Sequence, residues 1–170
     1  MNLFSTFATP ITSPMTMPAI HSLQQPQQLS LTNDLQEVTR LTAFVEHICS
    51  AFHLNDDATA DVNLAVEEAV ANVICYAYPE GTRGNIHISA SAEGGKLIFE
   101  IRDKGKPFDP TTVAEPDITA EAADRQIGGL GIFLIRHYMD DVRYERRNHE
   151  NILTLTYTRP YDNDHHQPGQ

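Results

Sequence analysis

The chain has 170 residues and a formal net charge of −11, from 12 Lys and Arg against 23 Asp and Glu. This length predicts one domain with a substantial core, and the acidic balance argues against binding to nucleic acid or to an anionic membrane surface. No apolar run approaches the ~20 residues of a membrane-spanning helix. Cys49 and Cys75 form no metal or redox spacing, which favours a reduced cytoplasmic protein with buried thiols.

The two ends of the chain are predicted to be tails. Residues 1–27 contain four prolines and no Asp, Glu, Lys or Arg, a composition typical of a disordered segment. Packing of this segment on a partner subunit is the alternative. Residues 161–170 are polar and are expected to form a second tail, so the folded domain is predicted over 28–160.

The predicted elements begin with a short strand over Leu29–Thr32. Residues 33–34 then begin a helix in a capping-box pattern, and its apolar positions recur at helical spacing through Phe52. Asn55 begins a second helix, with acids in the first turn where the helix dipole favours them, and this helix ends before Pro79.

Two alternating strands follow, joined by a turn at Gly94-Gly95. A loop over 110–127 comes next, and a loop of this length inside a domain is usually functional, for example as a lid. A third helix and two strands, Val142–Arg146 and Ile152–Thr158, complete the pattern. This order predicts an α+β two-layer sandwich, with a mostly antiparallel sheet and the helices on one face.

Glu68 and Asn72 are four residues apart on the second helix, so they share one face of it. Their apolar surroundings make such a pair costly unless it binds something. Glu68 could polarise a hydroxyl or a water, and Asn72 offers a hard oxygen suited to Mg²⁺. An ordinary surface pair is the alternative, and Glu67, on the neighbouring face, is expected to be solvated.

Two further segments carry candidate chemistry. Asp103 directly follows a predicted strand and precedes Gly105, so its carboxylate could accept a hydrogen bond from an exocyclic amine such as that of adenine. The glycines of 128–131 precede a helix, where exposed backbone N–H groups can bind phosphate. Arg125, just before them, could reach a terminal phosphate. The alternative for Asp103 is an ordinary turn residue, for the glycines a flexible hinge, and for Arg125 a balance to the neighbouring acids. Neither a P-loop nor a Rossmann fingerprint is present.

Taken in order, these patterns resemble the GHKL (Bergerat) ATP-binding fold, and within it the stand-alone anti-sigma-factor serine/threonine kinases of bacterial partner-switching systems. Leu64–Asn72 resembles the N-box of that family, Asp103–Asp109 its first Gly box, and Gly128–Arg136 its second. The resemblance spans roughly residues 28–159 of the chain.

The resemblance implies a role for each matching residue. Glu68 would be the catalytic base that activates a substrate serine, Asn72 would bind Mg²⁺, and Asp103 would bind the adenine amino group, with Gly105 allowing close approach. The implied nucleotide-binding set further contains Phe108, Leu130, the phosphate-binding Gly129 and Gly131, and Arg125 near the γ-phosphate.

The resemblance also implies a function and partners. We expect a Mg-ATP-dependent kinase that phosphorylates a STAS-domain anti-sigma antagonist and controls a sigma factor, with a homodimer as a further expectation. A non-catalytic, nucleotide-gated module that sequesters a regulator is the first alternative, and an interaction domain without nucleotide is the second. Glu68 favours the kinase, because a simple binder needs Asn72 and the glycines but no base.

Two positions depart from the family pattern. Tyr76 stands where the family often has His, and residues 150–152 replace a Gly-Thr pair that lies near the adenine. Thr154 or Thr156 are candidate substitutes for that pair. A sensor histidine kinase is not supported, because only His47 lies on an early helix and no matching continuation follows it.

Overall fold

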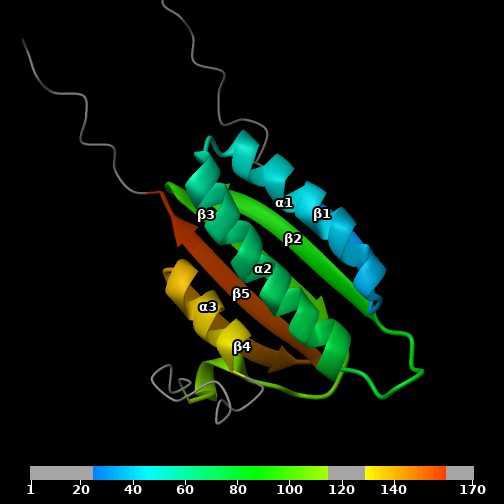
Figure 1. The fold of residues 1–170 in the computed structure, drawn as a ribbon. Helices are drawn as coiled ribbons and strands as arrows, with labels where there is room; N and C mark the ends of the chain where they lie inside the picture. The colour runs from blue at the N-terminus through cyan, green and yellow to red at the C-terminus, as the bar shows by residue number, and fades with distance from the viewer. Residues whose placement is uncertain (1–24, 115–128, 160–170) are drawn as a thin grey trace, which may run out of the picture.

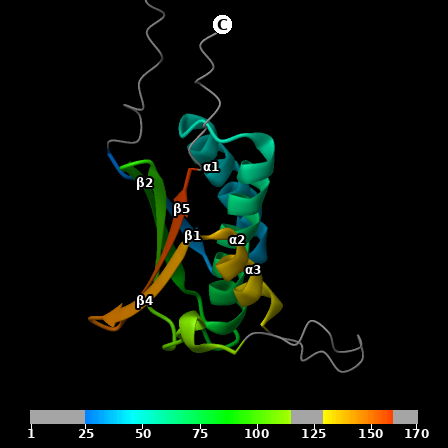
Figure 2. The ribbon, with the colours of Figure 1, turned by 90° about the vertical axis from the view of Figure 1, so that its left-hand side faces the viewer.

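The computed structural model describes residues 25–114 and 129–159. This part of the chain forms two layers, a five-stranded sheet and a layer of helices that covers one of its faces (Figures 1 and 2). The elements in chain order are β1 (Gln27–Thr32), the 3₁₀ turn η2 (Leu35–Glu37), α1 (Val38–Ala51), α2 (Asp56–Tyr76), β2 (Asn85–Glu93), β3 (Lys96–Asp103), the 3₁₀ turn η3 (Pro110–Thr112), α3 (Leu130–Tyr138), β4 (Asp141–Arg147) and β5 (Glu150–Thr158).

The sheet has the strand order β1-β2-β3-β5-β4, and every neighbouring pair is antiparallel. β2 and β3 form a hairpin whose two turn residues, Gly94 and Gly95, have φ of 57° and 79°. Both values lie in the left-handed region, which this tight turn requires and which glycine adopts without strain. The predicted α+β sandwich is confirmed.

The core lies between the two layers, with α2 over the middle of the sheet and α1 and α3 on either side of it (Figure 1). Alternate residues of β3 point toward the helices and are buried, as a strand with one covered face requires. α2 contributes a buried stripe at helical spacing. The stripe consists of Val62, Ala65, Val66, Ala69, Val70 and Ile74.

The helix starts differ in how they are capped. Asn55 caps α2 as predicted, because its side-chain oxygen accepts a hydrogen bond from the Ala58 N–H at 2.8 Å. The predicted start of the first helix is instead a 3₁₀ turn. Asp34 accepts from the N–H of Gln36, only two residues on, at 2.9 Å, a short-range bond that favours a turn. α1 then begins at Val38 without a side-chain cap.

The two cysteines have different environments. Cys49 is buried in the core, and burial, with a smaller contribution from Glu46, raises the pKa of its thiol to about 12. Cys75 is exposed near the end of α2. The prediction of two buried thiols is therefore wrong for Cys75, because the last turn of α2 carries this position away from the sheet.

Parts of the predicted organisation lie outside the described residues. These parts are 1–24 and 161–170 of the predicted tails, residue 160 of the predicted domain, and 115–127 of the predicted lid. β1 begins at Gln27, the last residue of the predicted N-terminal tail. No helix in the described ranges is long and apolar enough to cross a membrane.

Candidate functional site

A cavity of about 570 Å³ lies between the helices α2 and α3, the segment after β3, and the strands β4 and β5. The three sequence motifs, which are far apart in the chain, therefore contribute to one space together with β4 and β5. The sequence-predicted residues that line it are Glu68, Asn72, Asp103, Phe108, Gly129, Leu130 and Gly131.

α2 positions the first of these side chains. Glu68 and Asn72 are half-buried on successive turns, and both line the cavity. A Cβ atom at Gly131 would collide with Oε2 of Glu68. The first turn of α3 thus packs directly against this carboxylate, and a side chain at position 131 would displace it from its present position.

The neighbouring Glu67 has a different role. It is half-buried, and Oε1 accepts a hydrogen bond from the Thr42 hydroxyl of α1. The expectation that Glu67 is solvated is therefore wrong, because α1 packs beside α2 along this face. Glu67 connects two helices, whereas Glu68 faces the cavity.

Asp103 ends β3 and is 4% exposed. Its Oδ1 accepts hydrogen bonds from the Gly105 N–H at 2.7 Å and from the Asn151 side-chain amide at 2.9 Å. Both bonds are made to one carboxylate oxygen, and the residue lines the cavity. Asp103 is therefore suited to accept a hydrogen bond from a ligand through Oδ2.

Gly105 does not line the cavity. A Cβ atom at this position would collide with the backbone of Ala77, which follows the last turn of α2. The next residue, Lys106, donates its backbone N–H to the Ala77 carbonyl at 2.8 Å. The close approach that Gly105 permits in the structure is thus between the loop after β3 and the end of α2.

The third predicted segment is the start of α3. Gly129 is the N-cap, with φ of 115°, and its carbonyl accepts from the Phe133 N–H at 2.9 Å. The first N–H groups of a helix have no partner within the helix, and here they belong to residues that line the cavity. Gly128 and Arg125 lie outside the described residues.

The cavity combines polar ends with apolar walls. The walls are formed mainly by Val73, Ile132, Ile135 and Leu153. Three large apolar residues at the cavity are strongly exposed, namely Tyr76 at 63%, Leu130 at 60% and Phe108 at 46%. Among the lining residues that the structure describes, Lys106 is the only Lys or Arg. The side chains therefore offer little positive charge to an anionic ligand.

Sequence reasoning assigned no binding role to Asn151 and Tyr144, which line the cavity. It also assigned none to Arg136, which donates to the carbonyls of Val113 and Pro110 at the cavity. Asn151 is paired with Asp103 across the β3–β5 ladder, and it is the one polar residue at an inward position of β5 otherwise occupied by Leu153, Leu155 and Tyr157. That break in the alternation was the available signal. The proposed substitutes, Thr154 and Thr156, do not line the cavity, because the register places them beside Glu100 and Ile98.

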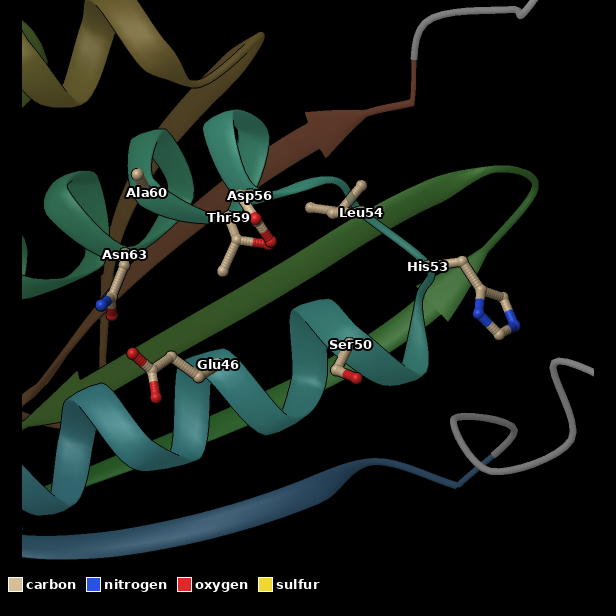
Figure 3. Close-up of a pocket in the computed structure, with 8 residues that line it drawn as sticks. All are labelled: Glu46, Ser50, His53, Leu54, Asp56, Thr59, Ala60 and Asn63. Atoms are coloured by element: carbon tan, nitrogen blue, oxygen red, sulfur yellow. The ribbon is translucent and has the colours of Figure 1, made fainter.

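A second cavity, of about 770 Å³, lies between the end of α1 and the start of α2 (Figure 3). Glu46 and Ser50 reach it from α1, and Asp56, Thr59 and Asn63 from α2. None of the sequence-predicted site residues lines this second cavity.

The pattern of the histidine kinase-like ATPase domain matches residues 31–157, which include every candidate site residue. The chain belongs to the histidine kinase-like ATPase family. Within this family it is 32% identical over 133 residues to the serine/threonine-protein kinase BtrW of Bordetella bronchiseptica, a match that covers 75% of this chain and 94% of the relative.

Two further similarities agree with this assignment. An anti-sigma F factor of Thermoanaerobacter is 30% identical over 107 residues, which cover 61% of this chain and 74% of the relative. A crystal structure of the RsbU and RsbW domains of a Mycobacterium tuberculosis protein aligns with a TM-score of 0.56 at 17% identity, over 80% of this chain and 33% of that chain. The structural likeness confirms the ATPase-domain fold.

Proposed function

We propose that this chain is a Mg-ATP-dependent protein serine/threonine kinase. The observation that supports this proposal is that two carboxylates line the same cavity. Glu68 lies beside Gly131 at the N-terminus of α3, and Asp103 is buried at the end where we place the adenine base. Glu68 and the helix N-terminus suit the phosphate end of a nucleotide, and the Asp103 carboxylate suits the exocyclic amine of adenine. The similarity to BtrW supports the same activity.

In the proposed reaction, Glu68 accepts the hydroxyl proton of the substrate serine. The serine oxygen then forms a bond to the γ-phosphorus of ATP, the bond to the bridging oxygen breaks, and ADP leaves. This chemistry requires mainly positioning and charge stabilisation. Gly129 and Gly131 present backbone N–H groups to the phosphates, as a helix N-terminus does for anions.

The residues present fit Mg²⁺ at the phosphate end of the cavity. Asn72 lines the cavity one helical turn from Glu68 and carries a neutral oxygen, and Mg²⁺ commonly takes few protein ligands together with phosphate oxygens. Because Lys106 is the only cationic side chain among the described lining residues, a bound metal ion would supply the charge neutralisation that phosphoryl transfer needs.

We further propose that the substrate is a STAS-domain anti-sigma antagonist and that the chain also binds a sigma factor. The similarity to an anti-sigma F factor supports a sigma-factor partner. The exposed apolar residues at the cavity, Tyr76, Phe108 and Leu130, offer a surface on which a protein substrate could place its serine next to Glu68.

The test is transfer of labelled phosphate from ATP, with Mg²⁺, to each STAS-domain protein of the source organism. We expect the unmodified chain to label one of them on Ser or Thr. Glu68→Gln should lower the transfer rate by about 10²–10⁴-fold, the usual contribution of a general base, while the calorimetric affinity for ATP stays within about threefold.

Glu67→Gln is the matched control, because Gln retains an oxygen that accepts from Thr42, and it should keep full activity. Equal transfer by Glu68→Gln and the unmodified chain would contradict the assigned base. Binding of ATP without transfer to any candidate would favour the nucleotide-gated module, and no binding of ATP would exclude both.

A further inference from the structure

A hydrogen-bonded cluster lies behind Asp103, formed by Asn151 on β5 and by Tyr144 and Arg146 on β4. The Asn151 amide nitrogen donates to Asp103 Oδ1 at 2.9 Å and to the Lys106 carbonyl at 3.0 Å. Its amide oxygen accepts from the Tyr144 hydroxyl at 2.8 Å and from Nη1 of Arg146. Asn151 is 6% exposed, so these bonds are largely removed from water.

These four bonds use the full capacity of the Asn151 side chain, since a primary amide has two N–H donors and an oxygen with two lone pairs. The orientation of the amide is also determined. A reversed amide would place its oxygen against the Asp103 carboxylate and its N–H groups against the donors of Tyr144 and Arg146. Asn151 therefore has no hydrogen bond left for a ligand and acts on Asp103 instead.

The consequence for Asp103 is that its carboxylate has one orientation. Oδ1 takes the N–H groups of Gly105 and Asn151, and Oδ2 remains to accept from a ligand in the cavity. An ionised carboxylate only accepts hydrogen bonds. A purine with a 6-amino group donates one to it, whereas a 6-oxo purine presents an acceptor, O6, at the same position and leaves Oδ2 without a donor there.

Arg146 extends the same cluster to the loop after β3, because its Nη1 also donates to the Gly105 carbonyl at 3.2 Å. β4 and β5 thus hold both the Asp103 side chain and the backbone of the loop that follows it. β4 is the edge strand of the sheet next to β5. Three residues outside the predicted motifs, Asn151, Tyr144 and Arg146, therefore determine the geometry around Asp103.

We propose that Asn151, held by Tyr144 and Arg146, is a positioning residue for Asp103, and that discrimination between 6-amino and 6-oxo purine nucleotides depends on this cluster. The proposal rests on the proposed function, because it requires that the cavity bind a purine nucleotide. It assigns selectivity to Asn151, a cavity-lining residue whose side-chain hydrogen bonds are all made to protein groups and not to the base.

The test is the ratio of the dissociation constants of ITP and ATP, measured by calorimetry on the full chain. The unmodified chain should prefer ATP by about tenfold or more. Asn151→Leu, which has nearly the same size, should weaken ATP binding by about tenfold and ITP binding by less than about twofold, since ITP gains nothing from an oriented Asp103. Tyr144→Phe, a smaller change that retains the ring, should lower the ratio by about two- to fivefold.

Leu153→Val is the matched control on β5, because Leu153 lines the cavity outside the cluster. It should weaken the binding of ATP and of ITP by the same factor and leave the ratio of their dissociation constants unchanged, as any general distortion of the cavity would. A ratio that is unchanged in both Asn151→Leu and Tyr144→Phe would overturn this proposal alone, as would equal binding of ATP and ITP by the unmodified chain. An unmodified chain that binds neither nucleotide would overturn the proposed function as well.

Discussion

Gly131 shows how one missing side chain leaves room for Glu68, the proposed catalytic base. The Glu68 carboxylate occupies the space in which a Cβ atom of residue 131 would lie. Gly131 is also the second residue of α3, and glycine is a poorer helix former than alanine, by roughly 1 kcal/mol in a helix interior. Packing against Glu68 therefore explains the glycine at this position, whereas helix stability does not.

Gly131→Ala should consequently separate activity from stability. The alanine methyl group would displace the end of the Glu68 side chain, which is flexible enough to move without unfolding the helix. We expect the rate of phosphate transfer to fall by about tenfold or more, because a small displacement of a reacting group lowers the rate strongly. The melting temperature should stay equal or rise. Unchanged transfer in a folded Gly131→Ala variant would contradict the proposal that Gly131 positions the Glu68 carboxylate for the reaction.

At the scale of elements, the cavity depends on how α3 is connected to the turn after β3. Arg136 on α3 donates to the carbonyls of Val113 at 2.8 Å and Pro110 at 2.6 Å. Both carbonyl residues line the cavity. A planar guanidinium can make two such bonds in a fixed fork, which a single ammonium group does not reproduce.

Arg136→Lys should therefore weaken ATP binding by about three- to tenfold, because one wall of the cavity loses its attachment to α3. Isothermal calorimetry would measure this change. Arg143→Lys is the matched control, since Arg143 is exposed and, among the residues that the structure describes, its side chain pairs with the half-exposed Asp141, and such pairs contribute little. Equal losses of affinity in the two variants would show that the effect is not specific to the α3 contact.

At the scale of the whole molecule, one buried thiol and two half-buried tyrosines make the fold sensitive to alkaline pH. Burial is the main cause of the raised pKa values of Cys49, Tyr78 and Tyr157. For Cys49 the pKa rises from 9.0 to about 12. Between these two values the unfolded chain loses a proton that the folded chain keeps, so the free energy of unfolding decreases as pH rises.

Urea unfolding at several pH values between 8 and 11 should show this loss of stability. Cys49→Ala should lower the stability at pH 8 through a small cavity, but the further decrease above pH 9 should be shallower than in the unmodified chain. Cys75→Ala, which removes an exposed thiol, should leave the slope unchanged. Identical slopes in all three proteins would contradict the assignment. The net charge of −11 acts in the same direction in every variant.

The sequence by itself determined the kinds of element and their order, because hydrophobic periodicity reports which face of a helix or strand is buried. It also determined the helix cap at Asn55, the Gly94-Gly95 turn and the motif residues, since each depends on neighbours within a few positions along the chain. The family resemblance followed from these motifs, and the matched domain confirms it.

Only the tertiary structure decided which side chains meet. Asn151 lies 48 residues from Asp103, and β5 places them together by pairing between β3 and β4. The different roles of Glu67 and Glu68 likewise depend on which helix packs on each face of α2. Periodicity indicates that a face is covered but not what covers it, because strand order and helix packing arise from contacts between distant segments.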